Sequence, residues 1–89
     1  MDPSMEQILA DLKKILVEEL FVEIPVEKIK DSDSLSTDIG LDSVGQIEFV
    51  SILEERYGLK IDVKQSGADL KTVGSTAEFI RKNLPANRH

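Results

Sequence analysis

The stretch Gly40-Leu41-Asp42-Ser43-Val44 marks the point at which an acid-rich loop gives way to an amphipathic helix. Asp42 is a good N-cap, because its carboxylate can accept hydrogen bonds from the backbone N–H groups that a helix start leaves unpaired. Ser43 then falls in the first turn with an accessible hydroxyl, where the positive end of the helix would favour a phosphate ester. Asp-Ser at a helix start is more often only a cap. The pair therefore predicts a helix start, with Ser43 as a candidate attachment point.

The expected helix runs from Ser43 to Tyr57 and ends at Gly58, a typical left-handed residue after a helix. Residues at helical spacing along it are Val44, Ile47, Val50, Leu53 or Glu54, and Tyr57. We assign Ile47, Val50, Leu53 and Tyr57 to the core. Gly45 costs on the order of 1 kcal/mol relative to alanine inside a helix. Either another group approaches its backbone closely, or the site merely tolerates glycine.

A first helix is expected from Met5 to about Leu20 or Phe21. Its apolar residues recur at helical spacing: Met5, Ile8, Leu9, Leu12, Ile15, Leu16 and Leu20. Ser4 and Gln7 have the spacing of a capping box at its start. Amphipathic periodicity and the cap together predict a helix that packs one face against a core.

The segment from Val26 to Leu41 follows Pro25, which stops the first helix, and it is rich in Asp, Ser and Thr. We expect a long ordered loop, pinned to the core by four apolar residues: Ile29, Leu35, Ile39 and Leu41. A short helix is expected near Ser66–Leu70, although Gly67 weakens it. The pattern after this segment predicts a last helix.

This last helix is expected to start at Ser75, capped together with Glu78, and to end at Pro85. Its inward residues would be Ala77, Phe79, Ile80 and Leu84. The fold class predicted is all-α: a small bundle of three main helices plus one short helix, with a long ordered loop between the first and second helices. Residues 1–85 would form the domain and residues 86–89 a disordered tail.

Composition excludes several classes of function. Eighty-nine residues make one small domain, too small for a second lobe with a deep cleft. The chain has no cysteine, and its single histidine is the terminal His89, so Cys–His or Ser–His catalysis has no credible parts. No secretion signal or membrane-spanning run is recognisable, so we expect a cytoplasmic protein without membrane insertion.

Charge is unevenly distributed along the chain. Residues 1–30 hold seven acids and four bases (−3), residues 31–62 eight acids and two bases (−6), and residues 63–89 two acids and five bases (+3). An acidic middle third would repel nucleic acid and attract a basic protein partner.

From the first helix through Ile80, the chain resembles the acyl carrier proteins and related carrier domains. The matching elements are individually weak but specific in their order and spacing: Asp42-Ser43-Val44 like the family's Asp-Ser-Leu signature, Glu48 five residues after the serine, the run Leu53-Glu54-Glu55, Ile61 just past the helix, and Thr72-Val73 before the last helix.

The resemblance implies that Ser43 receives 4′-phosphopantetheine from coenzyme A, attached by a phosphopantetheinyl transferase that uses Mg²⁺. The arm would carry an acyl or aminoacyl group as a thioester, with a thiol that this chain itself lacks. The protein would then be a monomeric carrier and not an enzyme. The resemblance also implies a surface read by basic patches on acyl-loading and acyl-processing enzymes: Asp42, Val44, Glu48, Glu54 and Glu55. For Glu54 and Glu55, a merely solvated helix face is an equal alternative.

Val44 stands where the family usually has Leu, and Gly45-Gln46 where many fatty-acid carriers have acidic or hydroxylated residues. These departures are similar to carriers of specialised pathways, including polyketide-type and aminoacyl or D-alanyl carriers. We therefore expect a discrete carrier outside bulk fatty-acid synthesis.

Two other classes of protein share features of this sequence. The acids from Asp31 to Asp42 suggest a calcium loop, but Leu35 would stand at a ligand position and Ser36 where the turn needs glycine. A cofactor-free acidic helical adaptor, with Ser43 only a cap, would keep its partner binding after Ser43→Ala. A carrier would lose its function and keep its fold.

Overall fold

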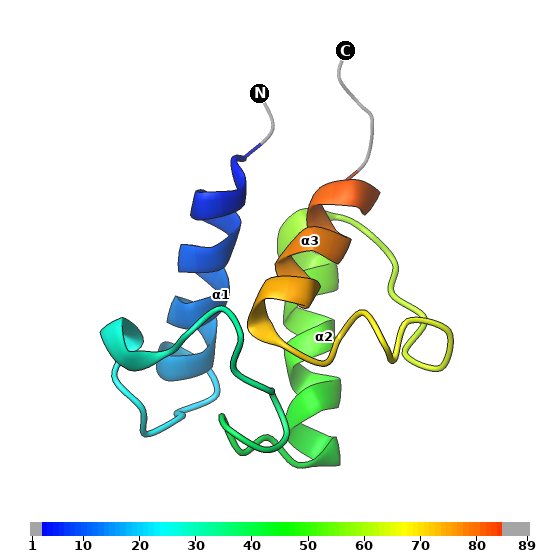
Figure 1. The fold of residues 1–89 in the computed structure, drawn as a ribbon. Coiled ribbons are helices and arrows are strands. Elements are labelled where there is room, and N and C mark those ends of the chain that lie inside the picture. Colours follow the sequence, from blue (N-terminus) through cyan, green and yellow to red (C-terminus); the bar gives the residue numbers. More distant parts are fainter. Residues whose placement is uncertain (1–2, 85–89) are drawn as a thin grey trace.

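The computed structural model describes residues 3–84, and within them the chain forms helices and loops without a named strand (Figure 1). The α-helices are α1 (Met5–Glu18), α2 (Ser43–Tyr57) and α3 (Val73–Asn83), with a 3₁₀-helix, η1 (Val26–Lys28), in the first loop. The all-α prediction is confirmed. The expected tail of residues 86–89 and the terminal residue His89 lie outside the described residues.

α2 runs in the opposite direction to α1, and α3 runs in the same direction as α2. The end of α1 and the start of α2 therefore lie at the same end of the molecule. In Figure 1, α1 descends, whereas α2 and α3 ascend. The loop between α1 and α2 crosses the lower end of the molecule, where α2 begins. None of the helices in the described part of the chain is long and apolar enough to cross a membrane.

The capping box predicted for α1 is confirmed, because Gln7 N donates to Ser4 Oγ (3.1 Å) and Ser4 N donates to Gln7 Oε1 (2.9 Å). The predicted end at Leu20 or Phe21 is two or three residues too late, because α1 ends at Glu18. Leu20 N and Val22 N turn back onto the carbonyls of Ile15 and Leu16, at 3.1 and 2.9 Å. This reversal ends the helix although apolar spacing continues.

The core contains apolar residues from all three α-helices and from both long loops. Its members are Ile8, Leu12, Ile15, Leu16, Ile29, Leu35, Ile39, Leu41, Phe49, Val50, Leu53, Leu59, Ile61, Val73, Ala77 and Ile80. The four predicted loop anchors are all among them. The loop before Ser43 is therefore held in place by burial, so the position of α2 is well determined.

The predicted start of α3 at Ser75 is wrong. Thr72 is the N-cap: Ser75 N donates to Thr72 Oγ1 (3.0 Å), and Thr72 N donates to Ser75 Oγ (3.1 Å). The next two N–H groups, of Val73 and Gly74, reach carbonyls of the first loop at 3.1 and 2.7 Å. Because that loop supplies acceptors, the helix begins two residues earlier than its own sequence indicates.

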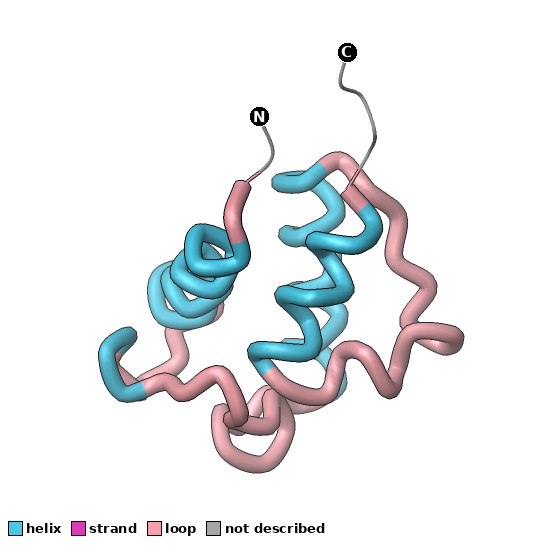
Figure 2. The backbone as a smooth tube through the Cα atoms, turned by 45° about the horizontal axis from the view of Figure 1, so that its top comes forward, coloured by secondary structure: helices cyan, strands magenta, loops and turns pink. Residues whose placement is uncertain are grey.

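The short helix predicted at Ser66–Leu70 is also wrong. Ser66 N donates to Asp62 O (2.8 Å) and Leu70 N to Ser66 O (3.1 Å), which closes separate turns instead of a continuous helix. Figure 2 shows this segment as loop. The one short helix in the described residues is η1, directly after Pro25, a residue that suits a helix start.

Candidate functional site

Ser43 is the first residue of α2, and Asp42 is its N-cap as predicted. Asp42 is extended, its Oδ1 accepts from Gly45 N (2.7 Å), and its carbonyl accepts from Gln46 N (2.9 Å). Gly40, with φ of 91°, makes the turn that leads into the cap. Ser43 is exposed, and within residues 3–84 its hydroxyl has no hydrogen-bond partner. The hydroxyl is therefore available for modification.

Gly45 faces the loop that precedes the helix. A Cβ at this position would lie 3.2 Å from Asp42 Oδ1 and 3.3 Å from Leu41 Cδ2. Of the two explanations left open by the sequence, close approach is the one that the structure shows. The absence of a side chain at Gly45 lets the cap and Leu41 sit tightly against the first turn.

The start of α2 suits a phosphate ester on Ser43. The N–H groups of Ser43 and Val44 lie in the first turn, where a helix provides no acceptors, and the helix is fifteen residues long. In the part of the chain that the structure describes, no basic side chain is hydrogen-bonded to the hydroxyl. The site thus presents an exposed hydroxyl to which the described residues bring no hydrogen-bonded base.

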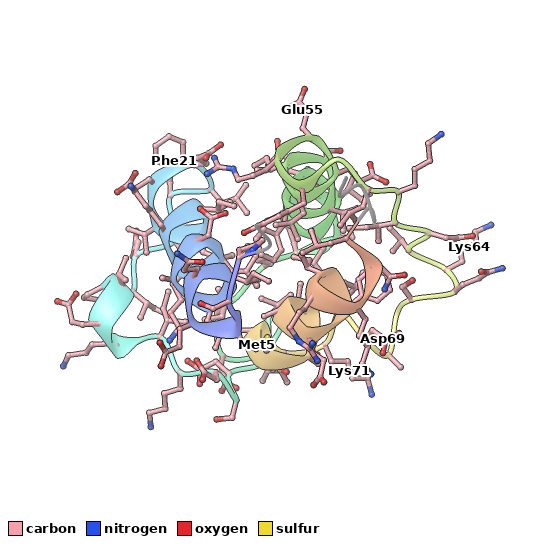
Figure 3. The ribbon with its side chains drawn as sticks, turned by 90° about the horizontal axis from the view of Figure 1, so that it is seen from above. Met5, Phe21, Glu55, Lys64, Asp69 and Lys71 are labelled. Atoms are coloured by element: carbon pink, nitrogen blue, oxygen red, sulfur yellow. The ribbon has the colours of Figure 1, made fainter. Side chains whose placement is uncertain are left out.

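The outward face of α2 combines apolar and acidic side chains. Val44 is 63 % and Ile47 59 % exposed, so the prediction that Ile47 lies in the core is wrong. Phe49, which the periodicity did not select, is buried at 2 %. Apolar residues occur around most of this helix, so spacing alone could not identify its buried side. Glu48 and Glu55 are exposed on the same outward face, and Figure 3 shows Glu55 pointing away from the molecule.

Glu54 and its neighbour Glu55 differ in their surroundings. Glu54 is half-buried, and its Oε2 accepts a hydrogen bond from Ile61 N at 2.7 Å. This contact ties the loop after α2 back onto the helix. The geometry therefore favours a structural role for Glu54, whereas Glu55 is free to meet a partner.

The far end of α2 is clamped to α1. Tyr57 Oη donates to Asp11 Oδ2 (2.6 Å), and Arg56 donates to Asp11 Oδ1 (3.1 Å) and Glu19 Oε2 (2.7 Å). Burial raises the pKa of Tyr57 well above its ordinary value, the hydrogen bond and charge of Asp11 raise it further, and Arg56 opposes them. Tyr57 is therefore a neutral donor at physiological pH, and the clamp sets the direction of the helix that presents Ser43.

Two hollows lie beside the first turns of α2. One, of about 430 Å³, has an apolar floor that includes Phe49, Val50, Leu53 and Leu70, with Ser34, Ser36, Thr37, Gln46 and Lys71 among its polar lining. The other, of about 630 Å³, is more open and is lined by Phe21, Asp42, Val44 and Glu48 among others. Ser43 itself lines neither hollow, but its neighbours Asp42 and Val44 line the second, and Gln46, three residues further along α2, lines the first.

The acids of the first loop do not form a calcium site in the described structure. Asp33 and Asp38 accept from backbone N–H groups of their own turns, Lys30 N (2.9 Å) and Ser34 N (2.8 Å). Asp31 pairs with Lys13 at 2.9 Å. Across residues 3–84, no three His, Cys, Asp or Glu side chains converge as metal ligands. These acids instead shape the loop that leads to Ser43.

Comparison with known proteins agrees with this geometry. A sequence model of the phosphopantetheine attachment site matches residues 10–80. An acyl carrier protein of Rhodopseudomonas palustris (strain TIE-1) is 39 % identical over 79 residues, which cover 89 % of this chain and 96 % of that protein. An acyl carrier protein of Nitrobacter winogradskyi is 39 % identical and one of Bradyrhizobium sp. (strain ORS 278) 38 % identical, over the same shares.

Proposed function

Because this chain belongs to the acyl carrier protein family, whose members are phosphopantetheine-bearing carriers and not enzymes, we propose that Ser43 is its attachment residue and that its cargo is an acyl group. The observation that carries the proposal is the exposed, unbonded hydroxyl of Ser43 at the start of a long helix capped by Asp42. The family match spans residues 10–80 and so includes this serine.

The attachment step requires little from this chain. Ser43 Oγ attacks the phosphorus next to the pantetheine of coenzyme A, an O–P bond forms, and adenosine 3′,5′-bisphosphate leaves. The proton of Ser43 passes to a base of the transferase, because the described residues hold none at hydrogen-bond distance. Once attached, the arm supplies the thiol that carries the cargo. The chain itself positions the hydroxyl and keeps it in solvent.

The test is intact-protein mass spectrometry after incubation with coenzyme A, Mg²⁺ and a broad-specificity phosphopantetheinyl transferase. We expect one phosphopantetheine group on the wild type and on Ser51→Ala, an exposed serine of the same helix, and none on Ser43→Ala. Modification of Ser43→Ala would overturn the assignment. Absence of modification of the wild type, while an established carrier is modified alongside, would refute the function and favour a cofactor-free adaptor.

The apolar floor of the 430 Å³ hollow supports an acyl cargo over an aminoacyl one. Its α2 wall includes Gln46, one turn from Ser43 on the helix, so the hollow is close to the attachment point. We expect hexanoyl-loaded protein to melt at a higher temperature than alanyl-loaded protein, because only the former has a chain to bury. Equal melting temperatures of the two forms would contradict an acyl-selective hollow.

The residues after Ser43 support a place in a polyketide-type or other specialised pathway, because Val44-Gly45-Gln46 departs from the pattern of bulk fatty-acid carriers. An aminoacyl or D-alanyl carrier is the alternative. The exposed acids Asp42, Glu48 and Glu55 support partner enzymes with basic docking patches.

A further inference from the structure

Phe21 has an unusual conformation and an unusual environment. It follows α1 with φ of 58°, and among residues 3–84 it is the only residue other than glycine with a positive φ. Its side chain is also 80 % exposed. A bulky residue in the left-handed region is strained, and an exposed aromatic ring contributes nothing to the core. Folding therefore gains nothing evident from a phenylalanine at this position.

The turn at Phe21 needs the left-handed conformation but not the ring. Leu20 N and Val22 N on either side bond to carbonyls of α1, which fixes the reversal that ends the helix. Glycine would adopt the same φ without strain. An explanation for the ring must therefore lie in what it contacts outside this chain.

The ring lies next to the attachment site. Phe21 lines the open 630 Å³ hollow together with Val44 and Glu48, and Val44 is adjacent to Ser43 in the sequence. Phe21 and Val44 are among the large apolar side chains that remain exposed. Figure 3 shows Phe21 on the same side of the molecule as Glu55, the side away from α3. The turn after α1 and the start of α2, which are far apart in the sequence, thus both contribute apolar surface near Ser43.

The charge around this apolar surface has one sign. The acidic residues that line the hollow are Glu23, Asp42 and Glu48, and among residues 3–84 no lysine or arginine lines it. A complementary surface would be apolar at its centre and would carry lysine or arginine at its rim. Aromatic side chains at the centre of an interface commonly carry much of its binding energy.

We propose that Phe21 anchors the phosphopantetheinyl transferase that modifies Ser43, an inference that rests on the proposed function. The ring would contact an apolar patch of the transferase that is bordered by basic residues. The transferase acts on the Ser43 oxygen itself, so it must cover the protein surface around that atom. Enzymes that act on the cargo can also dock on the acids of this surface, but their chemistry takes place at the far end of a flexible arm and does not require them to cover the Ser43 oxygen itself. The position of Phe21 beside Ser43 therefore favours the transferase as occupant.

The experiment measures kcat/KM for modification of Ser43 with coenzyme A, Mg²⁺ and a broad-specificity transferase, for the wild type, Phe21→Gly and Phe21→Trp. We expect Phe21→Gly to lower kcat/KM about tenfold, as for loss of a hot-spot side chain. Its thermal midpoint should equal or exceed that of the wild type, because strain is relieved. Phe21→Trp keeps a large ring and should stay within about twofold of the wild type.

Four results would overturn the proposal. A rate of modification of Phe21→Gly equal to that of the wild type would overturn it. A rate for Phe21→Trp as low as that for Phe21→Gly would also overturn it, because the ring would then not be what anchors the enzyme. Light scattering that shows a wild-type dimer and a Phe21→Gly monomer would identify a second copy of this chain as the occupant. If the wild type is not modified while an established carrier is, the proposed function fails, and this inference fails with it.

Discussion

The hydroxyl of Tyr57 donates to Asp11 Oδ2 at 2.6 Å, which joins the last turn of α2 to the middle of α1. The pKa of Tyr57 is raised above its ordinary value of 10.0, chiefly by burial and then by Asp11. The folded state thus holds this proton more tightly than the unfolded state. Its contribution to stability is complete below pH 10.0 and is lost as the pH rises toward the higher folded pKa.

Tyr57→Phe should lower the free energy of unfolding by about 1.5–3 kcal/mol at pH 7, because one hydrogen bond to a charged group is lost. Urea unfolding measures the difference. Above pH 10 the wild type should lose stability faster than the variant as the pH rises, so that the difference between their free energies of unfolding becomes smaller. Titration of lysines affects both proteins equally and does not change this difference. A difference in the free energy of unfolding that stays constant or grows with pH would contradict the role of the Tyr57 hydroxyl.

Glu54→Ala should destabilise the fold, whereas Glu55→Ala should not. Removal of the Glu54 carboxylate leaves the Ile61 N–H without its acceptor, at a cost of about 1–2 kcal/mol. Glu55 is exposed, and its loss should change stability by less than about 0.5 kcal/mol. Urea unfolding of both variants is the measurement. Equal stabilities would show that the Glu54 contact adds nothing.

Gly74→Ala should destabilise the junction between α3 and the first loop. A Cβ at Gly74 would lie 3.0 Å from the carbonyl oxygen of Asp31, which already accepts from Gly74 N. Overpacking of this kind costs about 1–3 kcal/mol. The matched control is Gly67→Ala, whose Cβ would meet only Val63 O at 3.5 Å. Thermal unfolding should separate the two variants, and a Gly74→Ala midpoint as high as that of the control would refute the close contact.

Glu48→Lys should slow transferase modification of Ser43 severalfold at low salt, because a basic partner would meet a positive charge beside the serine. The deficit should shrink near 1 M salt, where the Debye length is about 3 Å. Glu27→Lys makes the same change of net charge on η1 and serves as control. If the two variants slow modification equally at low salt, net charge explains the effect and Glu48 makes no specific contact.

Local signals were sufficient to predict the helix that presents Ser43. The cap at Asp42, the helix from Ser43 to Tyr57 and the left-handed Gly58 depend on hydrogen bonds and backbone preferences within a few residues. The family signature around Ser43 is likewise a local pattern, and the comparisons confirm the membership that it indicated.

Two of the wrong predictions concern features that depend on distant residues. The start of α3 was placed too late because the acceptors for its first N–H groups come from Asp31 and Asp33 in another loop. Ile47 was assigned to the core, but within the described part of the chain its side of α2 is left uncovered, and it is 59 % exposed. Helical spacing shows that a residue can face a neighbour, but it does not show whether a neighbour is there.

The sequence by itself determined the helical class, the capped helix that presents Ser43 and the family, because capping and periodicity act over one or two turns. Only the tertiary structure decided which surface surrounds that serine. The chain reversal after α1 places Phe21 beside Val44 and Glu48, and Ile61 engages Glu54 but leaves Glu55 exposed. These contacts join residues far apart in the chain, so they exist only once the core has packed.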